Sequence, residues 1–338
     1  MTVSVALATY NGEKFIREQL DSLLNQTVLP DEVVIIDDCS TDNTAEVVRE
    51  YIASHSLSWK FSVAQSNSGY KRNFYNCLAQ CSEDVVFLCD QDDVWYPQKL
   101  EKILEVFKND QACLAVNSSF DMTDGAGEII APFGVGKRKT ANHGLLKFSV
   151  LTGECIEVGL DTVLIYNISP GCTCAFKREV VEEYLKVSEC RLPHDWELNI
   201  IAAKNGGLRF LNLPLIGYRQ HGNNAIGLSE DESFGPLKMR GSVDVRFKMF
   251  DMQKAQLEAV LKNVDSNDLN QVRFCRALEI FCSNREKILR RGKLFPCFEN
   301  LMYFGRLRNV ATIHFRGIVG DFVYILKCKV KADDKQCN

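Results

Sequence analysis

The sequence lacks any apolar segment that would span a membrane. No run of about 18 apolar residues occurs in the chain. The first apolar segment, residues 2–9, is too short for a secretory signal peptide and lacks its basic flank. We therefore expect no transmembrane helix and no secretory leader, and we expect a cytoplasmic protein.

Excess positive charge and paired cysteine ligands are absent as well. The net charge is −4 and the pI is about 5.8, which argues against a dedicated nucleic-acid binder. The 14 cysteines are scattered through apolar segments without the C-x-x-C pairs of a structural zinc site. They fit free thiols in a reducing compartment.

Up to about residue 120, apolar runs alternate with helical periodicity. This pattern predicts an α/β fold with a mostly parallel central sheet flanked by helices. The expected strands are 3–8, 32–37, 59–64 and one that ends at Asp90, and the expected helices are 13–25, 44–54 and 72–81.

The second part of the chain is less regular. Its expected helices are 97–108 and 196–205, its expected strands are 112–116, 165–176, 208–213 and 215–219, and an irregular loop at 121–140 contains Lys137-Arg138-Lys139. From about Ser229 long helical patterns begin, at 245–261 and 269–289. We place a domain boundary there, with residues 1–228 as one domain and 229–338 as a helical C-terminal region.

The most informative motif is Asp90-Gln91-Asp92-Asp93, which follows the apolar run 85–89. Three carboxylates at the end of a buried strand repel one another and need a compensating cation. Hard oxygen ligands favour Mg²⁺ or Mn²⁺ over Zn²⁺, and such ions often complete their shell with substrate phosphates. A solvated acidic turn is the alternative.

Three expected strands end in polar clusters, at Thr9-Tyr10-Asn11-Gly12, at Asp37-Asp38 and at the acidic motif. The carboxyl ends of parallel strands line one crevice, where ligands bind. A nucleotide would fit there, with polar groups for its base and ribose and a metal for its phosphates.

These motifs together resemble family 2 glycosyltransferases. The matching segments are Thr9-Tyr10-Asn11, residues 37–42, residues 90–93 and His194-Asp195-Trp196; residues 66–69, 71–74 and 218–224 resemble the rhamnosyltransferase-like branch. The resemblance covers residues 1–227. It implies a glycosyltransferase A fold, a nucleoside-diphosphate sugar donor, and inversion at the anomeric carbon, with a nucleotide-binding half at 1–120 and an acceptor half at 121–228.

The resemblance also implies roles for individual residues. The donor nucleotide would contact Thr9, Tyr10, Asn11, Asp37, Asp38, Arg72, Asn73 and Asp90. Asp37 and Asp38 are equally good candidates for the base or ribose contact, and helix capping is their alternative. Metal ligands would be Asp92, Asp90 and His221, with Asp92 the leading one.

Asp195 matches the position of the family's catalytic base, which removes the acceptor hydroxyl's proton. An N-cap on the helix that follows is the alternative. Donor sugar or acceptor would meet Asp93, Gly171, Cys172, Thr173, His194 and Trp196. Gly171 would permit close backbone approach, the cysteines near it would pack, and His194 would orient the acceptor or form a turn.

Arg219 and His221 are implied as diphosphate contacts. Arg219 would bind it bidentately or would form an ordinary salt bridge. His221 would contact phosphate or metal, or would be structural. His194 stands where the family often has an acidic residue, which leaves the acceptor geometry open.

The C-terminal region is rich in basic and aromatic residues. The basic ones are Lys287, Arg290, Arg291, Lys293, Arg306, Arg308, Arg316, Lys327, Lys329 and Lys331, interleaved with Phe295, Phe298, Tyr303, Phe304, Phe315, Phe322 and Tyr324. An interfacial helix on anionic lipid at the inner face of the cell membrane and an ordinary solvated helix both explain this pattern.

We therefore expect a Mn²⁺- or Mg²⁺-dependent inverting hexosyltransferase. Its partners would be a nucleoside-diphosphate sugar, with dTDP-rhamnose as the leading donor, and a growing cell-surface polysaccharide or lipid-linked glycan. A UDP-hexose or UDP-N-acetylhexosamine transferase is the nearest alternative. A phosphatase of the haloacid dehalogenase type, with Asp90 as nucleophile, and a non-catalytic nucleotide-sugar-binding protein belong to other classes; the oligomeric state stays open.

Overall fold

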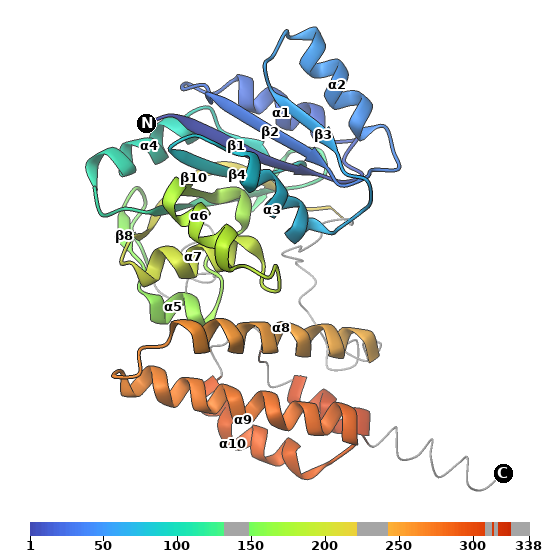
Figure 1. Cartoon of the computed structure of the whole chain (residues 1–338), viewed down its shortest axis with the longest axis vertical. Coiled ribbons are helices and arrows are strands. Elements are labelled where there is room, and N and C mark those ends of the chain that lie inside the picture. Colours follow the sequence, from blue (N-terminus) through green and yellow to red (C-terminus); the bar gives the residue numbers. More distant parts are fainter. Residues whose placement is uncertain (132–148, 222–242, 308–312, 314–316, 326–338) are drawn as a thin grey trace, which may run out of the picture. The chain divides into compact units, whose positions relative to one another are not determined.

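The computed structural model of the chain describes residues 1–131, 149–221, 243–307, 313 and 317–325 (Figure 1). The chain forms two compact units. Unit 1 comprises Met1–Val163 and Asn167–Leu228, and unit 2 comprises Leu164–Tyr166 and Ser229–Asn338. That 1–228 and 229–338 are separate domains stays a prediction, because compactness alone does not test independent folding.

Unit 1 is built on a ten-stranded sheet of order β3-β2-β1-β4-β9-β6-β10-β5, with β7 paired to β6 and β8 to β10. The strands are β1 Val3–Thr9, β2 Glu32–Asp37, β3 Lys60–Val63, β4 Val85–Asp90, β5 Val94–Trp95, β6 Ala115–Thr123, β7 Ile129–Ala131, β8 Cys155–Glu157, β9 Cys174–Lys177 and β10 Leu208–Arg219. Strands β1 to β4 pair in parallel, whereas β9 runs antiparallel to both β4 and β6. The sheet is therefore mixed, and its parallel part is the half that the sequence pattern described best.

Helices cover both faces of this sheet (Figure 1). They are α1 Ile16–Leu24, α2 Thr44–Ser54, α3 Tyr70–Gln80, α4 Lys99–Asn109, α5 Leu160–Ile165, α6 Arg178–Val187 and α7 His194–Lys204. Alternate residues of β1, Val3, Val5 and Leu7, share one core with α1 and α4. The intervening residues point to the opposite face, where α3 packs on β1 and β2.

The parallel register brings three strand ends together. Thr9 at the end of β1 pairs with Asp37 on β2, and Ala8 pairs with Asp90 on β4. The prediction that these polar strand ends meet at one edge of the sheet is confirmed. They form the floor of the candidate site.

Strand boundaries in the second half of unit 1 differ from the predicted ones. The strand expected at 112–116 is β6, which begins at Ala115 and continues to Thr123 into the expected loop. The strands expected at 208–213 and 215–219 are one strand, β10, with irregular register on both sides of Pro214. Proline donates no ladder hydrogen bond, so it interrupts the pattern without ending the strand.

The strand predicted at 165–176 is wrong. Its first residue ends α5, a 3₁₀ turn covers Gly171–Thr173, and only β9 from Cys174 is extended. Ile168 and Cys172 are nevertheless buried, so the apolar run reflects burial within unit 1. Pro170 and Gly171 are the breakers that limit the strand. Lys137-Arg138-Lys139 of the expected loop lie outside the described residues.

Unit 2 is helical, with α8 Val243–Asn263, α9 Leu269–Arg291, α10 Phe295–Leu307 and a further helical segment at 317–325. The helices predicted at 245–261 and 269–289 are confirmed. Asp268 caps α9 by accepting the N–H groups of Asn270 and Gln271, and Gly292 ends it in the left-handed conformation. Among the described helices none is long and apolar enough to cross a bilayer.

Candidate active site

The acidic motif lies where β4 ends and the short strand β5 begins. Carboxylate oxygens of Asp90 and Asp93 and the Cys172 sulfur all lie within 4.8 Å of one another. Burial raises the pKa of both carboxyls, and the negative charge of Asp92 raises both further. The Oδ2 atom of Asp93 is buried and accepts no N–H or O–H hydrogen bond from the described residues. The surroundings of the cluster therefore disfavour full ionisation of its carboxyls in the absence of a cation.

A buried lysine that we did not predict as a site residue places positive charge near the acidic cluster. Lys99 is the first residue of α4, and its ammonium lies 3.8 Å from the centroid of the Trp95 ring and donates to the Cys172 carbonyl. Burial lowers its pKa to about 8, and its charge in turn lowers the pKa of Asp93. A signal was present in the sequence, because Lys99 falls on the apolar face of an amphipathic helix with Ile103.

Asp92 and His221 are 129 positions apart in the sequence and meet in the structure. Their Oδ2 and Nε2 atoms are 2.7 Å apart, and the His221 ring stacks on Phe15 with centroids 4.6 Å apart. The predicted metal ligands thus fall into two groups: Asp92 lies with His221, and Asp90 lies with Asp93, which was not predicted as a ligand. Carboxylate and imidazole donors beside an uncompensated Asp93 oxygen fit a hard divalent cation. The Asn223 and Asn224 positions of this loop lie outside the described residues.

Arg219, a predicted diphosphate contact or salt-bridge partner, lies buried beside the acidic motif. Its guanidinium is buried and donates to Glu18 at 2.5 Å, to the Asp92 carbonyl at 2.8 Å and to the Gly125 carbonyl at 3.1 Å. Its backbone N–H donates to Asp93 Oδ1. The salt bridge that was the alternative is present, and these bonds anchor the acidic loop; a contact of Arg219 with a diphosphate stays a prediction.

The two carboxylates at the end of β2 are fully engaged. Asp37 accepts from the Thr9 hydroxyl at 2.8 Å and from the backbone N–H and hydroxyl of Ser40. Asp38 accepts from the hydroxyl and N–H of Ser68 and from the N–H of Gly69, just before α3. Neither caps α2, whose N-cap is Asn43. Both therefore shape the loops around the predicted nucleotide position.

Asn11 and Asn73 also hold the loops. Asn11 has a φ of 49° and accepts the N–H of Thr41, while the Asn73 amide donates to the carbonyls of Thr9 and Ile36. Arg72 is exposed and lies over the Tyr75 ring, so it turns along α3. The structure thus gives Asn73 a bridging role and does not bring Arg72 to the carboxylates.

Gln91, which we did not predict as a site residue, fixes the Tyr10 backbone. Its amide accepts from the Tyr10 N–H at 2.8 Å and donates to the Tyr10 carbonyl at 2.9 Å. A Cβ at Gly12 would lie 2.1 Å from the Gln91 oxygen, so a larger residue there would displace the Gln91 amide from the Tyr10 backbone. The Tyr10 ring is 43% exposed and is available to stack on a planar ligand.

Asp195 lies at the second position of α7. The N-cap is Pro193, so the N-cap alternative is wrong. The Asp195 carboxylate accepts from the Asn167 amide at 2.7 Å and from the backbone N–H of Trp196, while burial raises its pKa to about 6. Its charge also raises the pKa of Asp90. A buried carboxylate with a pKa near neutrality thus lies near the acidic cluster, and such a group is suited to accept a proton.

His194 is buried beside Asp195. Its ring stacks on Phe74 with centroids 3.9 Å apart, and burial lowers its pKa to about 3. Neither ring nitrogen has a hydrogen-bond partner within the described part of the chain. A Cβ on Gly171 would lie 3.1 Å from His194 Nε2 and 3.5 Å from Asp195 Cβ, so the Gly171 backbone lies close to both side chains, and its close approach to a donor or acceptor stays a prediction.

Three other predicted contact residues have partners within the protein. The Trp196 indole is buried and donates to the Val163 carbonyl at 2.5 Å. The Thr173 hydroxyl donates to the Pro170 carbonyl at 2.8 Å. Cys172 is buried against the acidic cluster, where burial raises the pKa of its thiol. Trp196 and Thr173 therefore have structural partners and Cys172 packs against the acidic cluster, while contacts of these residues with a donor or acceptor stay predictions.

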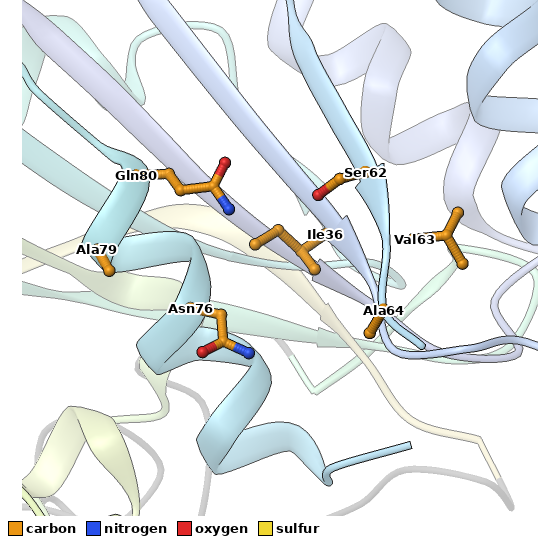
Figure 2. Close-up of a pocket in the computed structure, with 7 residues that line it drawn as sticks. All are labelled: Ile36, Ser62, Val63, Ala64, Asn76, Ala79 and Gln80. Carbon is orange, nitrogen blue, oxygen red and sulfur yellow. The ribbon is translucent and has the colours of Figure 1, made fainter. Parts of the chain in front are cut away.

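A separate cavity of about 310 Å³ lies between α3 and the edge of the sheet. Figure 2 shows its lining, which comprises Ile36, Ser62, Val63, Ala64, Asn76, Ala79 and Gln80. None of the predicted site residues lines it. The carboxylate cluster and Asp195, not this cavity, therefore define the candidate active site.

Comparison with known proteins places the chain in a fold class and then in a family. The structure resembles that of Staphylococcus aureus TarS 1–349 in complex with UDP-GlcNAc, with a TM-score of 0.55, 20% identity and coverage of 98% of this chain and 92% of the other. A mannosyltransferase from Pyrobaculum calidifontis, in complex with GDP-Man and Mn²⁺, matches with a TM-score of 0.51, 19% identity and coverage of 97% and 80%. The chain has the glycosyltransferase A fold, as predicted.

The family model described as glycosyl transferase family 2 matches residues 4–157. An uncharacterized glycosyltransferase of Nostoc sp. is 29% identical over 72% of this chain and 73% of its own length. The dTDP-rhamnosyl transferase RfbG of Shigella flexneri is 28% identical over 65% and 73%. Residues 4–157 therefore form a glycosyltransferase family 2 domain, and the chain that carries this domain is a nucleotide-sugar glycosyltransferase. The phosphatase alternative finds no support.

Proposed function

We propose that the protein is a metal-dependent inverting hexosyltransferase in which Asp195 is the catalytic base. The observation that carries this proposal is the position of a buried carboxylate with a pKa of about 6 near an acidic cluster that lacks full charge compensation. A base and a place for a diphosphate leaving group are the two elements that direct sugar transfer needs.

In the proposed reaction Asp195 accepts the proton of the acceptor hydroxyl. The hydroxyl oxygen attacks the anomeric carbon from the face opposite the leaving group, and the bond from that carbon to the diphosphate oxygen breaks. The products are the glycoside with inverted configuration, the nucleoside diphosphate and protonated Asp195. Asn167 orients the base through its 2.7 Å hydrogen bond.

Asp92 and His221 would hold the Mn²⁺ or Mg²⁺, with Asp90 and Asp93 beside them. When bound, the ion supplies charge neutralisation for the departing diphosphate. Lys99 holds positive charge beneath the cluster. The Asp93 carboxylate would otherwise repel the anionic donor. The metal ion and Lys99 together lower this repulsion between protein and substrate.

The base and ribose of the donor would lie at the ends of β1 and β2. Tyr10 offers an exposed ring for stacking, and its backbone is held by Gln91. Asp37, Asp38, Asn11 and Asn73 shape this end through the loops that they bind.

We propose dTDP-rhamnose as the donor, supported by the similarity to the Shigella rhamnosyl transferase. A UDP-hexose or UDP-N-acetylhexosamine is the second candidate, supported by the fold shared with TarS in complex with UDP-GlcNAc. The proposed acceptor is a hydroxyl of a cell-surface polysaccharide or lipid-linked glycan. A cytoplasmic enzyme, peripheral to the inner face of the membrane, fits the free state of the cysteines that the structure describes.

A panel of nucleotide sugars tests the function. Thermal unfolding is measured with each donor in the presence of Mn²⁺, since a ligand of the native state raises the transition temperature. We expect dTDP-rhamnose to give the largest shift, and release of dTDP with a glycan acceptor to require Asp195. Donor binding without release of nucleotide by any acceptor fraction would instead favour the non-catalytic sugar-binding protein.

A further inference from the structure

Helix α10 in unit 2 exposes an apolar stripe. Phe295, Phe298, Leu301 and Met302 are 71%, 51%, 40% and 82% exposed. At about 100° per residue these four side chains occupy one continuous arc of the helix. The opposite arc, which includes Pro296, Cys297, Asn300 and Leu307, is buried in unit 2. The helix is thus apolar on the side that its own unit does not cover.

The stripe continues onto the neighbouring helical segment at 317–325. Val319 and Val323 are exposed there one turn apart, and Phe322 of the same segment meets Phe298 edge to face, with ring centroids 6.0 Å apart. Contiguous apolar surface of this kind is uncommon on a monomeric soluble protein and marks an interaction site.

Basic side chains border this stripe. Arg290, Arg291 and Lys293 are exposed where α9 ends and α10 begins, and Arg306 is exposed in the last turn of α10. We call these four residues the basic rim. Acidic residues in this region offset little of that charge. Glu286 pairs with Arg290 at 3.6 Å and Glu299 is partly buried on α10, while Asp321 is buried against Arg285. The surface around the stripe therefore carries net positive charge.

We propose that the apolar stripe and its basic rim dock onto the headgroup layer of an anionic phospholipid bilayer. Aromatic and aliphatic side chains enter the boundary between headgroups and acyl chains, while arginine and lysine bind the lipid phosphates. A symmetric contact between two copies would place the basic rim against itself, which charge repulsion disfavours. The predicted residues Arg308, Phe315, Arg316, Lys327, Lys329 and Lys331 lie outside the described part and carry none of this argument.

Co-sedimentation of the full chain with vesicles tests the proposal. Vesicles of phosphatidylcholine alone are compared with vesicles that also contain phosphatidylglycerol. We expect binding to the anionic vesicles, weakened by salt, and a loss of roughly tenfold in partitioning for the double variant Phe298→Glu, Met302→Glu. Met302 is largely exposed and Phe298 half exposed, so the variant should keep a cooperative thermal unfolding transition, with a midpoint lowered slightly by loss of the contact with Phe322.

Two controls separate the explanations. Leu151→Glu changes an equally exposed apolar residue of unit 1, 76% exposed, and should bind vesicles as the wild type does. The double variant Phe298→Ser, Met302→Ser removes apolar area without adding charge and should also lose binding. Equal sedimentation of all variants, or no binding of the wild type to anionic vesicles, overturns the proposal. A wild-type dimer in light scattering that the glutamate variant dissociates would assign the stripe to a second copy and overturn it as well.

Discussion

The two groups of carboxylates at the edge of the sheet differ in what satisfies them. Asp37 and Asp38, at the end of β2, each accept three or more hydrogen bonds from neighbouring loops. Asp90 and Asp93, at the end of β4, lie together with raised pKa values and an unbonded oxygen. The first group has its hydrogen bonds filled by the protein, whereas the second would be stabilised by a bound cation. Motif matching alone assigns both groups to the donor, but their surroundings give them different roles.

The largest effect is expected where the base is removed. Asp195→Asn should lower turnover by about a thousandfold or more, because it removes the proton acceptor. Donor binding with Mn²⁺, measured by titration calorimetry, should change little. The variant should be no less stable than the wild type above pH 6, since the asparagine avoids burying a charge. Lost folding would favour a structural role for Asp195 and contradict this assignment.

The next largest effect is expected for Asp92, which pairs with His221. Asp92→Ala should weaken Mn²⁺-dependent donor binding by about 10- to 100-fold, since a direct ligand is lost. Mn²⁺ titration followed by electron paramagnetic resonance measures this directly. Asp38→Asn is the matched control, because it changes a carboxylate of the same edge that is bound to Ser68, and Mn²⁺ affinity should stay near that of the wild type. An equal loss of Mn²⁺ affinity in both variants would contradict the difference proposed between the carboxylates at the end of β2 and those that follow β4.

Substitution by asparagine should change stability in opposite directions in the two groups. Asp37→Asn should lower the free energy of unfolding by about 1–3 kcal/mol, because it weakens three hydrogen bonds. Asp93→Asn should raise it in metal-free protein at pH 8. The folded-state pKa of Asp93 lies above its unfolded value, so its ionisation as pH rises through that pKa lowers stability. Denaturant titration at pH 8 measures both, and the same sign in both variants would contradict this comparison.

The smallest effect is on the pH profile. Because the pKa of Asp195 is about 6, the fraction of ionised base is halved there. We expect kcat/KM to fall about twofold at pH 6 and about tenfold for each further unit of acid. An Asn167→Ala variant removes the amide that stabilises the ionised form, so its acid limb should move to higher pH. A profile flat between pH 5 and 8 would argue against Asp195 as the base.

Local patterns in the first half of unit 1 were predicted well. The bounds of β2 and α2 match those expected, because buried parallel strands read as short apolar runs and helices as a 3.6-residue period. The run at 165–176 failed for a related reason. Burial in a loop and burial in a strand leave the same apolar signature, and only the packing around Gly171 and Asp195 distinguishes them.

The site residues likewise fall into those that the sequence indicated and those that only the structure revealed. Residue type and order indicated the acidic motif, Asp195 and His221, since carboxylate and imidazole chemistry depends on the side chain itself. Residue type did not reveal that Arg219 is occupied by Glu18, that Trp196 belongs to the core, or that Lys99 and Gln91 serve the site. Each of these roles depends on partners distant in the sequence.

The sequence by itself therefore determined the fold class, the family and the chemical types present in the site, because these depend on periodicity and on the identity of side chains. Only the tertiary structure decided which carboxylates have their hydrogen bonds filled and which have raised pKa values and an oxygen without a hydrogen bond. Hydrogen bonding and desolvation are set by neighbours that the chain brings together across many residues, as with Asp92 and His221. The same holds for the stripe on α10, whose exposure no local pattern specifies.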